Sequence, residues 1–466
     1  MNKEEWYRLR DDRTRRIDSV SQGIFDAEIE VILEDDISKC YSCQLMALVA
    51  LNLLSRWCRK IHVIMPTDVP ILLPINGDKS FNCLLNETMT SIDPYGDFTF
   101  NKKHNIKAKR LIIGNNASIY INSDDVKICG DGWISGIGTK GQDVGLKGCN
   151  KNPIGPSFAA CLGVSALFGD AGGIGLKDRK GYYSLFNFTG PVQNCGELEN
   201  PDIPEDLDFG RLYQVGCGAV GSSLSYLLSQ TDYQGEIHLI DYDEIEIENL
   251  CSSLAFFAED AYLSKKKVLI SNRLFDESRI KSIPHIGDYD NFLSEGLYLT
   301  SPPDTILCLA NERNIWDTIQ SNCPPLVIHG TTTVNWGINF GRHYPFTEWC
   351  LMCRFKDDVI QTATMECAKG TIAVNVKDEK EIIGVLPFLS TASAVLVLTE
   401  IIRANAFKIR SSVNQSIFSF SPIGGMKFLS LTRKKISDCP KCSKQYLGIY
   451  PNEIKRTKHW TKSDGK

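Results

Sequence analysis

The amino-acid sequence predicts an α/β protein with two similar halves, each built on a mostly parallel sheet. In the second half, short apolar runs typical of strands alternate with segments typical of helices. Such alternation places helices on the faces of a parallel sheet. A glycine-rich turn joins the first strand and helix of that half, and the first half repeats much of the same order without such a turn.

The second half is expected to alternate regularly up to residue 330. Its predicted strands are 211–216, 236–241, 281–286, 305–309 and 325–330, and its predicted helices are 219–230, 264–276 and 312–321. A glycine- and aromatic-rich loop follows, and then come two cysteine pairs. The remaining predicted elements are a buried helix near 386–405 and strands at 416–420 and 426–432.

The first half shows the same plan but lacks a phosphate-binding turn. We expect strands at 28–33, 61–65, 110–113 and near Ile128, and helices at 42–57 and 157–168. The first strand runs into Glu34-Asp35-Asp36, whose carboxylates would repel a phosphate. The glycines of SGIGTKG (Gly136, Gly138 and Gly141) have neither a strand directly before them nor a helix directly after. We therefore expect this half to be structural.

Composition narrows the class of protein. The 466 residues are 43% hydrophobic and 23% charged with a formal net charge of −5, which suits a soluble globular protein and gives no general argument for nucleic acid or membrane as partner. The N-terminus lacks the apolar core of a signal peptide. The 17 cysteines are therefore expected to be reduced thiols, metal ligands or catalytic groups of a cytoplasmic protein.

Four segments follow from these patterns, with a boundary in the proline- and acid-rich stretch GELENPDIPEDLDFG near residue 200. They are an arginine-rich arm (1–20), an inactive first domain (21–200), an active nucleotide-binding domain (201–445) and a basic tail (446–466).

The glycine turn is the strongest functional signal. Gly216-x-Gly218-x-x-Gly221 follows an apolar strand and opens a helix, and Asp241 ends the next strand twenty positions after the last glycine. Gly216 permits a tight turn, Gly218 lets the backbone approach a phosphate, and Gly221 lets the helix pack closely on the strand. The helix N-terminus attracts an anion, and Asp241 can accept hydrogen bonds from ribose hydroxyls. The pattern predicts nucleotide binding; the alternative is a tight Rossmann-like turn without a ligand.

Beyond Asp241 the chain continues with Asp243, Asn249-Leu250 and, 18 positions after Asn249, Lys267 in SKKKV. In these motifs it resembles the MoeB/ThiF superfamily, which includes ubiquitin-activating enzymes. The resemblance implies two ThiF-type halves, ATP and Mg²⁺, with Asp241 on the ribose, Asn249 on the phosphates and Lys267 neutralising the attacked α-phosphate. Adenylation develops negative charge that an ammonium and Mg²⁺ stabilise.

Two positions depart from the family pattern. Its Arg-Gln pair is Ser252-Ser253 here, and its Mg²⁺-binding aspartate is Ala310, although Asn311 remains. Asp243 or Glu312 could assist the metal. Since relatives take an arginine from the partner domain, the N-terminal arm could supply one from among Arg8, Arg10 and Arg13.

Two cysteine pairs predict a structural zinc site. Cys350-x-x-Cys353 and Cys439-Pro-x-Cys442 provide four thiolates, the tetrahedral set that zinc prefers in a closed site. The gap of 85 residues between the pairs is long for a zinc ribbon but similar to that in the family. A disulfide or redox role is the alternative.

Cys367, in TATMECAKG, is the expected catalytic nucleophile. In relatives that form a thioester, the cysteine follows the first zinc pair and precedes a buried helix, as Cys367 does here. The alternative is an inert thiol, and Cys217, Cys251 and Cys308 are better explained as core fillers. The segment 329–345, with its glycines, corresponds to the region where relatives pass the carrier's C-terminal tail.

The resemblance implies an ATP-dependent enzyme that adenylates the C-terminal glycine of a ubiquitin-like protein, captures it as a thioester and passes it to a ubiquitin-conjugating enzyme. The two-half layout resembles the activating enzymes of bacterial, Bil-type antiphage operons, and a homodimer is possible. Three alternatives stay open: a sulfur-carrier adenylyltransferase of cofactor biosynthesis, an NAD-dependent oxidoreductase, and a catalytically dead scaffold.

Overall fold

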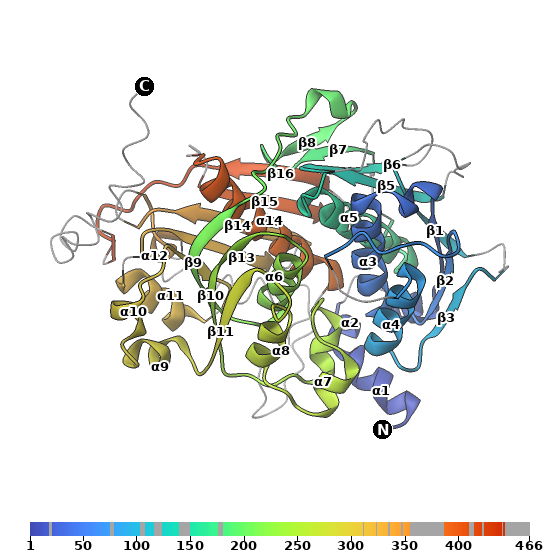
Figure 1. Cartoon of the computed structure of the whole chain (residues 1–466), viewed down its shortest axis with the longest axis horizontal. Helices are drawn as coiled ribbons and strands as arrows, with labels where there is room; N and C mark the ends of the chain where they lie inside the picture. The colour runs from blue at the N-terminus through green and yellow to red at the C-terminus, as the bar shows by residue number, and fades with distance from the viewer. Residues whose placement is uncertain are drawn as a thin grey trace.

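The chain forms two eight-stranded sheets in the computed structural model (Figure 1). The structure describes residues 1–17, 21–74, 79–102, 108–115, 124–138, 150–175, 180–310, 312–322, 324–333, 336–345, 348–354, 386–409, 414–421, 424–439 and 441–442.

The first sheet has the strand order β3-β2-β1-β4-β5-β6-β7-β8. Neighbouring strands from β3 to β5 are parallel, and those from β5 to β8 are antiparallel. The bounds are β1 Glu28–Leu33, β2 Lys60–Ile64, β3 Asp97–Phe100, β4 Lys109–Ile113, β5 Val126–Asp131, β6 Ile134–Gly138, β7 Gly181–Ser184 and β8 Thr189–Val192.

The second sheet repeats this order as β11-β10-β9-β12-β13-β14-β15-β16, again with parallel pairing as far as β13 and antiparallel pairing after it. The bounds are β9 Asp208–Val215, β10 Gln234–Asp241, β11 Ile280–Ile286, β12 Thr305–Cys308, β13 Val327–Thr333, β14 Gly337–His343, β15 Gln415–Ser421 and β16 Gly425–Leu431. The predicted α/β class with two mostly parallel sheets is therefore confirmed.

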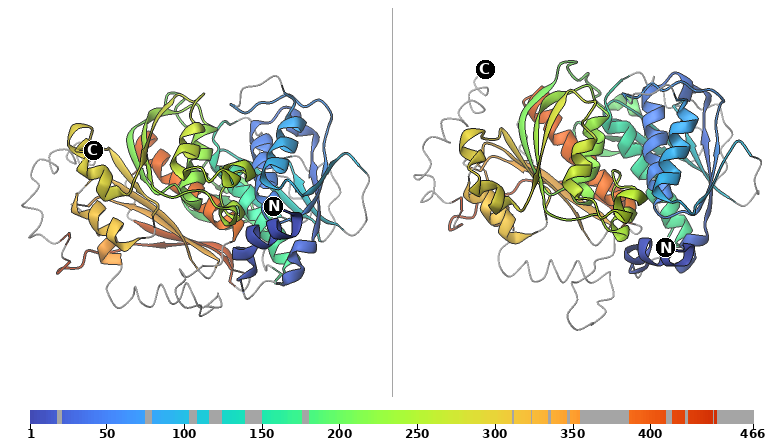
Figure 2. Two further views of the ribbon diagram at one scale, coloured as in Figure 1. Left: turned by 90° about the horizontal axis from the view of Figure 1, so that it is seen from below. Right: turned by 60° about the horizontal axis from the view of Figure 1, so that its bottom comes forward.

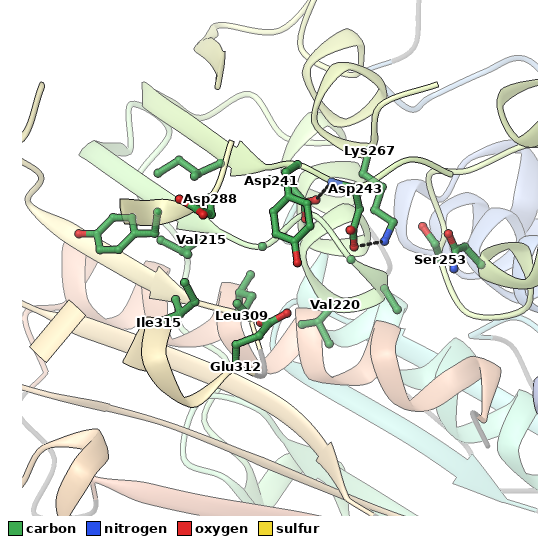
Figure 3. Close-up of a pocket in the computed structure, with 18 of the residues that line it drawn as sticks. Val215, Val220, Asp241, Asp243, Ser253, Lys267, Asp288, Leu309, Glu312 and Ile315 are labelled. Atoms are coloured by element: carbon green, nitrogen blue, oxygen red, sulfur yellow. Dashed lines mark hydrogen bonds and ion pairs between the residues drawn. The ribbon is translucent and has the colours of Figure 1, made fainter. Parts of the chain in front are cut away.

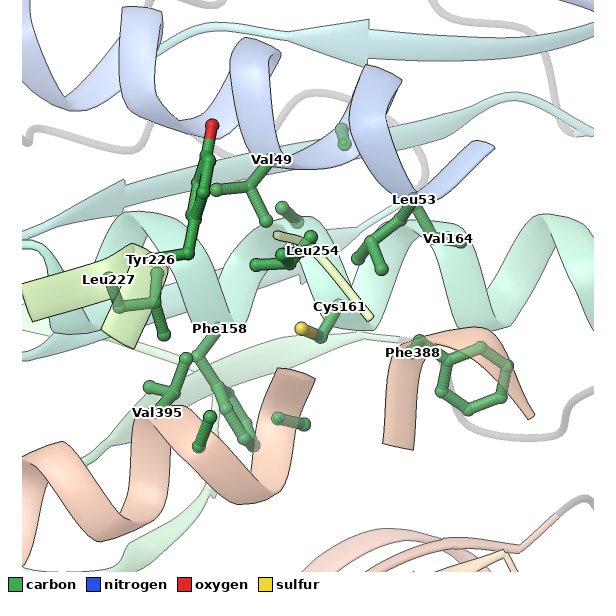
Figure 4. Packing of buried hydrophobic residues seen from close by; sticks show 14 of the residues in the cluster. Val49, Leu53, Phe158, Cys161, Val164, Tyr226, Leu227, Leu254, Phe388 and Val395 are labelled. Atoms are coloured by element: carbon green, nitrogen blue, oxygen red, sulfur yellow. The ribbon is translucent and has the colours of Figure 1, made fainter. Parts of the chain in front are cut away.

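Apolar helices from both halves share one core (Figures 2 and 4). Figure 4 shows α3 (Tyr41–Ser55) and α5 (Ile154–Ala171) of the first half packed with α6 (Ala219–Ser229) and α14 (Pro387–Ala406) of the second. Phe158 of α5 reaches Phe418 of the second sheet, with ring centroids 4.9 Å apart. Helices α5 and α14 are long and apolar enough to span a membrane, but 89% and 100% of their apolar windows are buried inside the protein. They are core helices here.

The remaining helices are shorter. They are α1 Lys3–Arg10, α2 Asp12–Arg15, α4 Phe81–Ile92, α7 Ala258–Tyr262, α8 Lys267–Arg273, α9 Tyr289–Ser294, α10 Leu297–Thr300, α11 Arg313–Ser321 and α12 Leu351–Arg354, with 3-10 turns at Gln22–Asp26, Asp35–Ser38, Cys195–Glu197 and Ile247–Cys251 (η4).

One predicted helix, 264–276, was wrong in its extent. The chain forms α7 and α8 instead, and Ser264 between them has a φ of 44°, a conformation that a helix cannot contain. The backbone N–H of Lys265 then donates to the carbonyl of Asp260. Lys267 consequently opens α8 rather than lying inside a helix.

The turn after β1 is occupied by a buried ion pair. Lys127 Nζ lies 3.0 Å from Glu34 Oε2, and both side chains are buried. A Cβ on Gly114 would lie 2.2 Å from Glu34 Oε2, so the carboxylate fills the space beside the end of β4. Gly136 and Gly138 lie within the antiparallel strand β6, while Gly141 falls outside the described residues.

Candidate functional site

The glycine turn joins β9 to α6 as the sequence predicts, and each glycine has a different environment. Gly216 has a φ of 103°, and a Cβ there would lie 2.9 Å from the backbone N of Ala310. A Cβ on Gly221 would lie 2.0 Å from the carbonyl oxygen of Gly216, so only glycine lets α6 pack this closely. Around Gly218, by contrast, the space is open, which leaves room for a ligand at the start of α6.

Asp241 closes this turn from the end of β10. Its Oδ2 accepts a hydrogen bond from the backbone N–H of Cys217 at 2.6 Å, and its Oδ1 accepts one from Asp243 at 2.8 Å. Burial raises the pKa of Asp241 above its ordinary value, although these two donors and the charge of Lys267 oppose the shift. The carboxylate is thus held rigidly at the edge of the turn, with further lone pairs for a ligand.

A cavity of about 720 Å³ opens over the turn (Figure 3). Its size is typical of a site for a small molecule or cofactor. Figure 3 places the apolar Val215 and Ile315 toward one end and Lys267 and Ser253 toward the other. The cavity therefore has one end with apolar side chains beside Asp288 and another end that carries the ammonium of Lys267.

Several cavity residues were not anticipated from the sequence: Tyr242, Phe256, Asp288, Tyr289, Asn291, Thr331, Thr332 and Ser390. The positions of some of them in the sequence could have indicated the site. Asp288 and Tyr289 follow the end of β11, and in parallel sheets the residues after the strand ends gather at one edge, where ligands bind.

Lys267 is held by Asp243 across the cavity wall. Its Nζ lies 2.7 Å from Asp243 Oδ2, with side-chain exposures of 12% for the lysine and 48% for the aspartate. The backbone N–H of Lys267 also donates to the carbonyl of Asp243. The lysine is thus fixed in place, while its carboxylate partner remains open to the cavity.

Asn249 lies in η4 and lines the same cavity. Its Oδ1 accepts a hydrogen bond from the backbone N–H of Glu246 at 3.0 Å, which orients the side-chain amide. Ser252 and Ser253 follow and are buried, and Ser253 Oγ lies 2.5 Å from Ser222 Oγ of α6. Where the family pattern has an arginine and a glutamine, this chain therefore has a neutral loop tied to the helix.

Among the three arm arginines named from the sequence, Arg13 lines the cavity. Arg10 was a wrong candidate, since it is buried and bound to Asp11 and Asp93, and Arg8 is exposed and absent from the cavity lining. Trp6 of α1 anchors the arm, with its ring 5.4 Å from that of Tyr262, the last residue of α7. Helices α1 and α7 lie side by side in Figure 1. The first residues of the chain thus deliver a guanidinium to a site formed by its second half.

Beyond the end of β12, Ala310 and Glu312 line the cavity, and Asn311 falls outside the described residues. The Ala310 methyl group cannot bind a metal. Asp243 and Glu312 both face the cavity and are carboxylates, the ligand type that Mg²⁺ prefers.

The four zinc-candidate cysteines converge. The Sγ atoms of Cys350, Cys353, Cys439 and Cys442 all lie within 4.8 Å of one another, with separations of 3.8, 3.6 and 3.2 Å for three of the pairs. A tetrahedral zinc with Zn–S bonds of about 2.3 Å separates its sulfurs by about 3.8 Å. The cluster can therefore hold zinc. Lys441 joins it to α11 through Asp317 and Ser321, at 2.8 and 2.7 Å.

Cys367 falls outside the described residues. Cys217, Cys251 and Cys308 are buried, as expected for core fillers, and burial raises the pKa of the Cys217 and Cys251 thiols. In segment 329–345, Thr331 and Thr332 line the cavity.

Comparison with known proteins gives one family match. Residues 28–177 match the model of the BilD N-terminal domain. A protein of Sinorhizobium fredii named uncharacterized protein y4jF is 25% identical over 239 residues, which is 49% of this chain and 43% of that protein. This chain thus aligns with less than half of that relative's length.

Solved structures with similar arrangements include Escherichia coli MccB with ATP and PaaA. The first is 18% identical and covers 69% of this chain and 99% of its own, with a TM-score of 0.38. PaaA is 13% identical, and the match covers 48% of this chain and 72% of PaaA, with a TM-score of 0.36. Residues 28–177 thus resemble a BilD N-terminal domain, which confirms the resemblance to Bil-type proteins in the first half of the chain.

Proposed function

We propose that the chain is an ATP-dependent adenylating enzyme of the E1-like class. The observation that carries this proposal is one cavity lined by the glycine turn, Asp241, Asn249, Lys267 and Arg13. These residues come from separate parts of the chain and together supply an anion-binding helix N-terminus, a ribose acceptor and two cations. A turn that served only packing would need none of these charged groups.

In the proposed reaction, the C-terminal carboxylate of a carrier protein attacks the α-phosphorus of ATP. A bond forms between the carboxylate oxygen and the α-phosphorus, the α–β phosphoanhydride bond breaks, and pyrophosphate leaves. Asp241 holds the ribose hydroxyls, and Asn249 donates its amide N–H groups to phosphate oxygens. Lys267 and Arg13 stabilise the charge that develops on the phosphates.

Asp243 and Glu312 would hold Mg²⁺, which neutralises phosphate charge when bound. Asp243 also pairs with Lys267 in the present structure.

We further propose that the carrier is a ubiquitin-like protein that ends in glycine. Cys367 attacks the carbonyl carbon of the adenylate, a thioester forms and AMP leaves. A ubiquitin-conjugating enzyme then takes the acyl group by thioester exchange. The BilD-type domain supports a role in Bil-type antiphage conjugation in the cytoplasm. The zinc cluster clamps the fold, since four thiolates leave no open position for a substrate.

ATP–pyrophosphate exchange with a candidate carrier tests the proposal. The wild-type protein should exchange only when the carrier is present, and Asp241→Ala should abolish exchange. Full exchange in Asp241→Ala would refute the ribose role. Binding of NAD in place of ATP would identify an oxidoreductase. A carrier thiocarboxylate, with no thioester on the enzyme, would favour the sulfur-carrier alternative.

A further inference from the structure

The first half lacks a glycine turn of its own, yet it contacts the wall of the cavity directly. Residues 250–256, which run from the end of η4 toward α7, are buried. This segment brings Ser252, Ser253 and Phe256 to the cavity. Buried backbone carbonyls outside regular structure need hydrogen-bond partners, and three carbonyls of this segment find theirs in α3.

Arg56, at the C-terminal end of α3, binds two of these carbonyls. Its Nη1 donates to Leu250 O at 2.6 Å, and Nη1 and Nη2 donate to Phe256 O at 3.3 and 3.4 Å. Asn52, one helical turn earlier, donates from Nδ2 to Leu254 O at 3.2 Å. Asn52 Oδ1 in turn accepts from Arg56 Nε at 2.9 Å. Two side chains of the first half thus hold both ends and the middle of the segment.

The charge of Arg56 is not neutralised locally. The side chain is buried, and among the described residues no carboxylate forms an ion pair with it. Burial lowers the pKa of Arg56 to about 9, still above neutrality. A buried cation held only by neutral oxygens adds positive potential behind the cavity wall. If the position served only packing, an apolar side chain would fill it without the free-energy cost of desolvating a charge.

We infer that Arg56, with Asn52, is a positioning residue through which the first half shapes and polarises the phosphate end of the cavity. The inference rests on the proposed function for the identity of the ligand. It assigns a task to the first half, whose first strand runs into Glu34 and not into a glycine turn. The effect should be confined to the phosphate end, because Ser253 lies on the side of Lys267 and away from Ile315 (Figure 3).

The test uses the full-length protein and compares Arg56→Met, Arg56→Lys and Asn52→Ala with the wild type. Hydrogen exchange reports the protection of residues 250–257, and calorimetry reports the affinities for ATP with Mg²⁺ and for adenosine. Glu34→Gln is the control, because it removes a buried charge from the same half without touching this segment.

Arg56→Met should speed exchange in 250–257 and weaken ATP binding about tenfold, a change of about 1.4 kcal/mol, while leaving adenosine binding unchanged. Arg56→Lys should recover part of the ATP affinity because the charge is kept. Asn52→Ala removes two hydrogen bonds, one to Leu254 O and one from Arg56 Nε, and tests whether α3 holds the segment should Arg56→Met fail to fold. Glu34→Gln should change neither readout.

If hydrogen exchange in residues 250–257 were as slow in the Arg56 and Asn52 variants as in the wild type, these two side chains would not hold the segment. Equal losses of ATP and adenosine affinity would reduce Arg56 to a structural residue and overturn the positioning role. Wild-type protein that binds no ATP would overturn the proposed function, and the exchange data would still decide whether α3 holds the segment.

Discussion

Lys267 Nζ lies 2.7 Å from Asp243 Oδ2, and the backbone N–H of the same lysine donates to the Asp243 carbonyl at 3.0 Å. Two bonds between the same residues join the start of α8 to the end of β10. The lysine is thereby oriented before any nucleotide arrives, so less side-chain entropy is lost on binding.

Lys267→Ala should lower carrier-dependent pyrophosphate exchange about 100-fold, since a positioned cation no longer stabilises the charge of the transition state. Lys265→Ala is the matched control, because Lys265 pairs with Asp260 and neither residue lines the cavity. Exchange assays at saturating ATP measure both. If the two variants lost the same activity, Lys267 would have no special role.

Arg13→Ala should weaken ATP binding about tenfold, because one of the two cations that line the cavity is removed. Arg15 is exposed, lies two residues away and stacks over Phe25, so Arg15→Ala is the control. Calorimetry with ATP and Mg²⁺ measures the change. An Arg13→Ala protein with wild-type affinity would show that the arm only packs against η4.

Metal analysis should find one zinc per chain, and Cys439→Ser/Cys442→Ser should abolish it. Structural zinc contributes about 10–16 kcal/mol of apparent binding free energy, so the variant should melt at a markedly lower temperature. Cys83→Ser, at an exposed cysteine, should retain metal and melting temperature. Zinc-free wild-type protein of full stability would refute the structural role.

Cys367→Ala should keep pyrophosphate exchange and lose the thiol-sensitive adduct with the carrier, because adenylation precedes thioester formation. Cys83→Ala should keep both. Gels run with and without reductant measure this, because reductant removes the thiol-sensitive adduct. An adduct that persists in Cys367→Ala would place the nucleophile at another cysteine.

Glu236→Gln should destabilise the protein at neutral pH by about 1–2 kcal/mol, since the carboxylate accepts hydrogen bonds from several charged partners at a partly exposed site. Hydrogen bonds from Lys281 and Arg211 lower the pKa of Glu236 to about 2. Its stabilisation is therefore present above the ordinary pKa and declines as the pH falls from about 4.5 toward 2. Urea unfolding at pH 7, 5 and 4 should show the difference between variant and wild type narrowing at the lowest pH. A constant difference would contradict this origin.

Many elements of the second half could be predicted from local sequence. The strand, glycine turn, helix, strand and Asp241 lie within about thirty residues, and each depends on near neighbours: the positive φ of Gly216, the close packing at Gly221 and the open space at Gly218. The extent of α8 could not be predicted, because it depends on Ser264 adopting a left-handed conformation.

The partners of these residues depended on packing between distant segments. Arg13 could be named only as one of three candidates in the arm, and Arg56 on the carbonyls of 250–256 leaves no periodic or spacing signal. Each contact spans about 200 residues of chain. The buried ion pair between Lys127 and Glu34 likewise joins residues 93 positions apart. Local chemistry thus specified the nucleotide turn, whereas the association of the two halves through α3, α5, α6 and α14 decided which charges surround it. Patterns along a chain report short-range preferences; the position of a buried charge is set by the elements that pack around it.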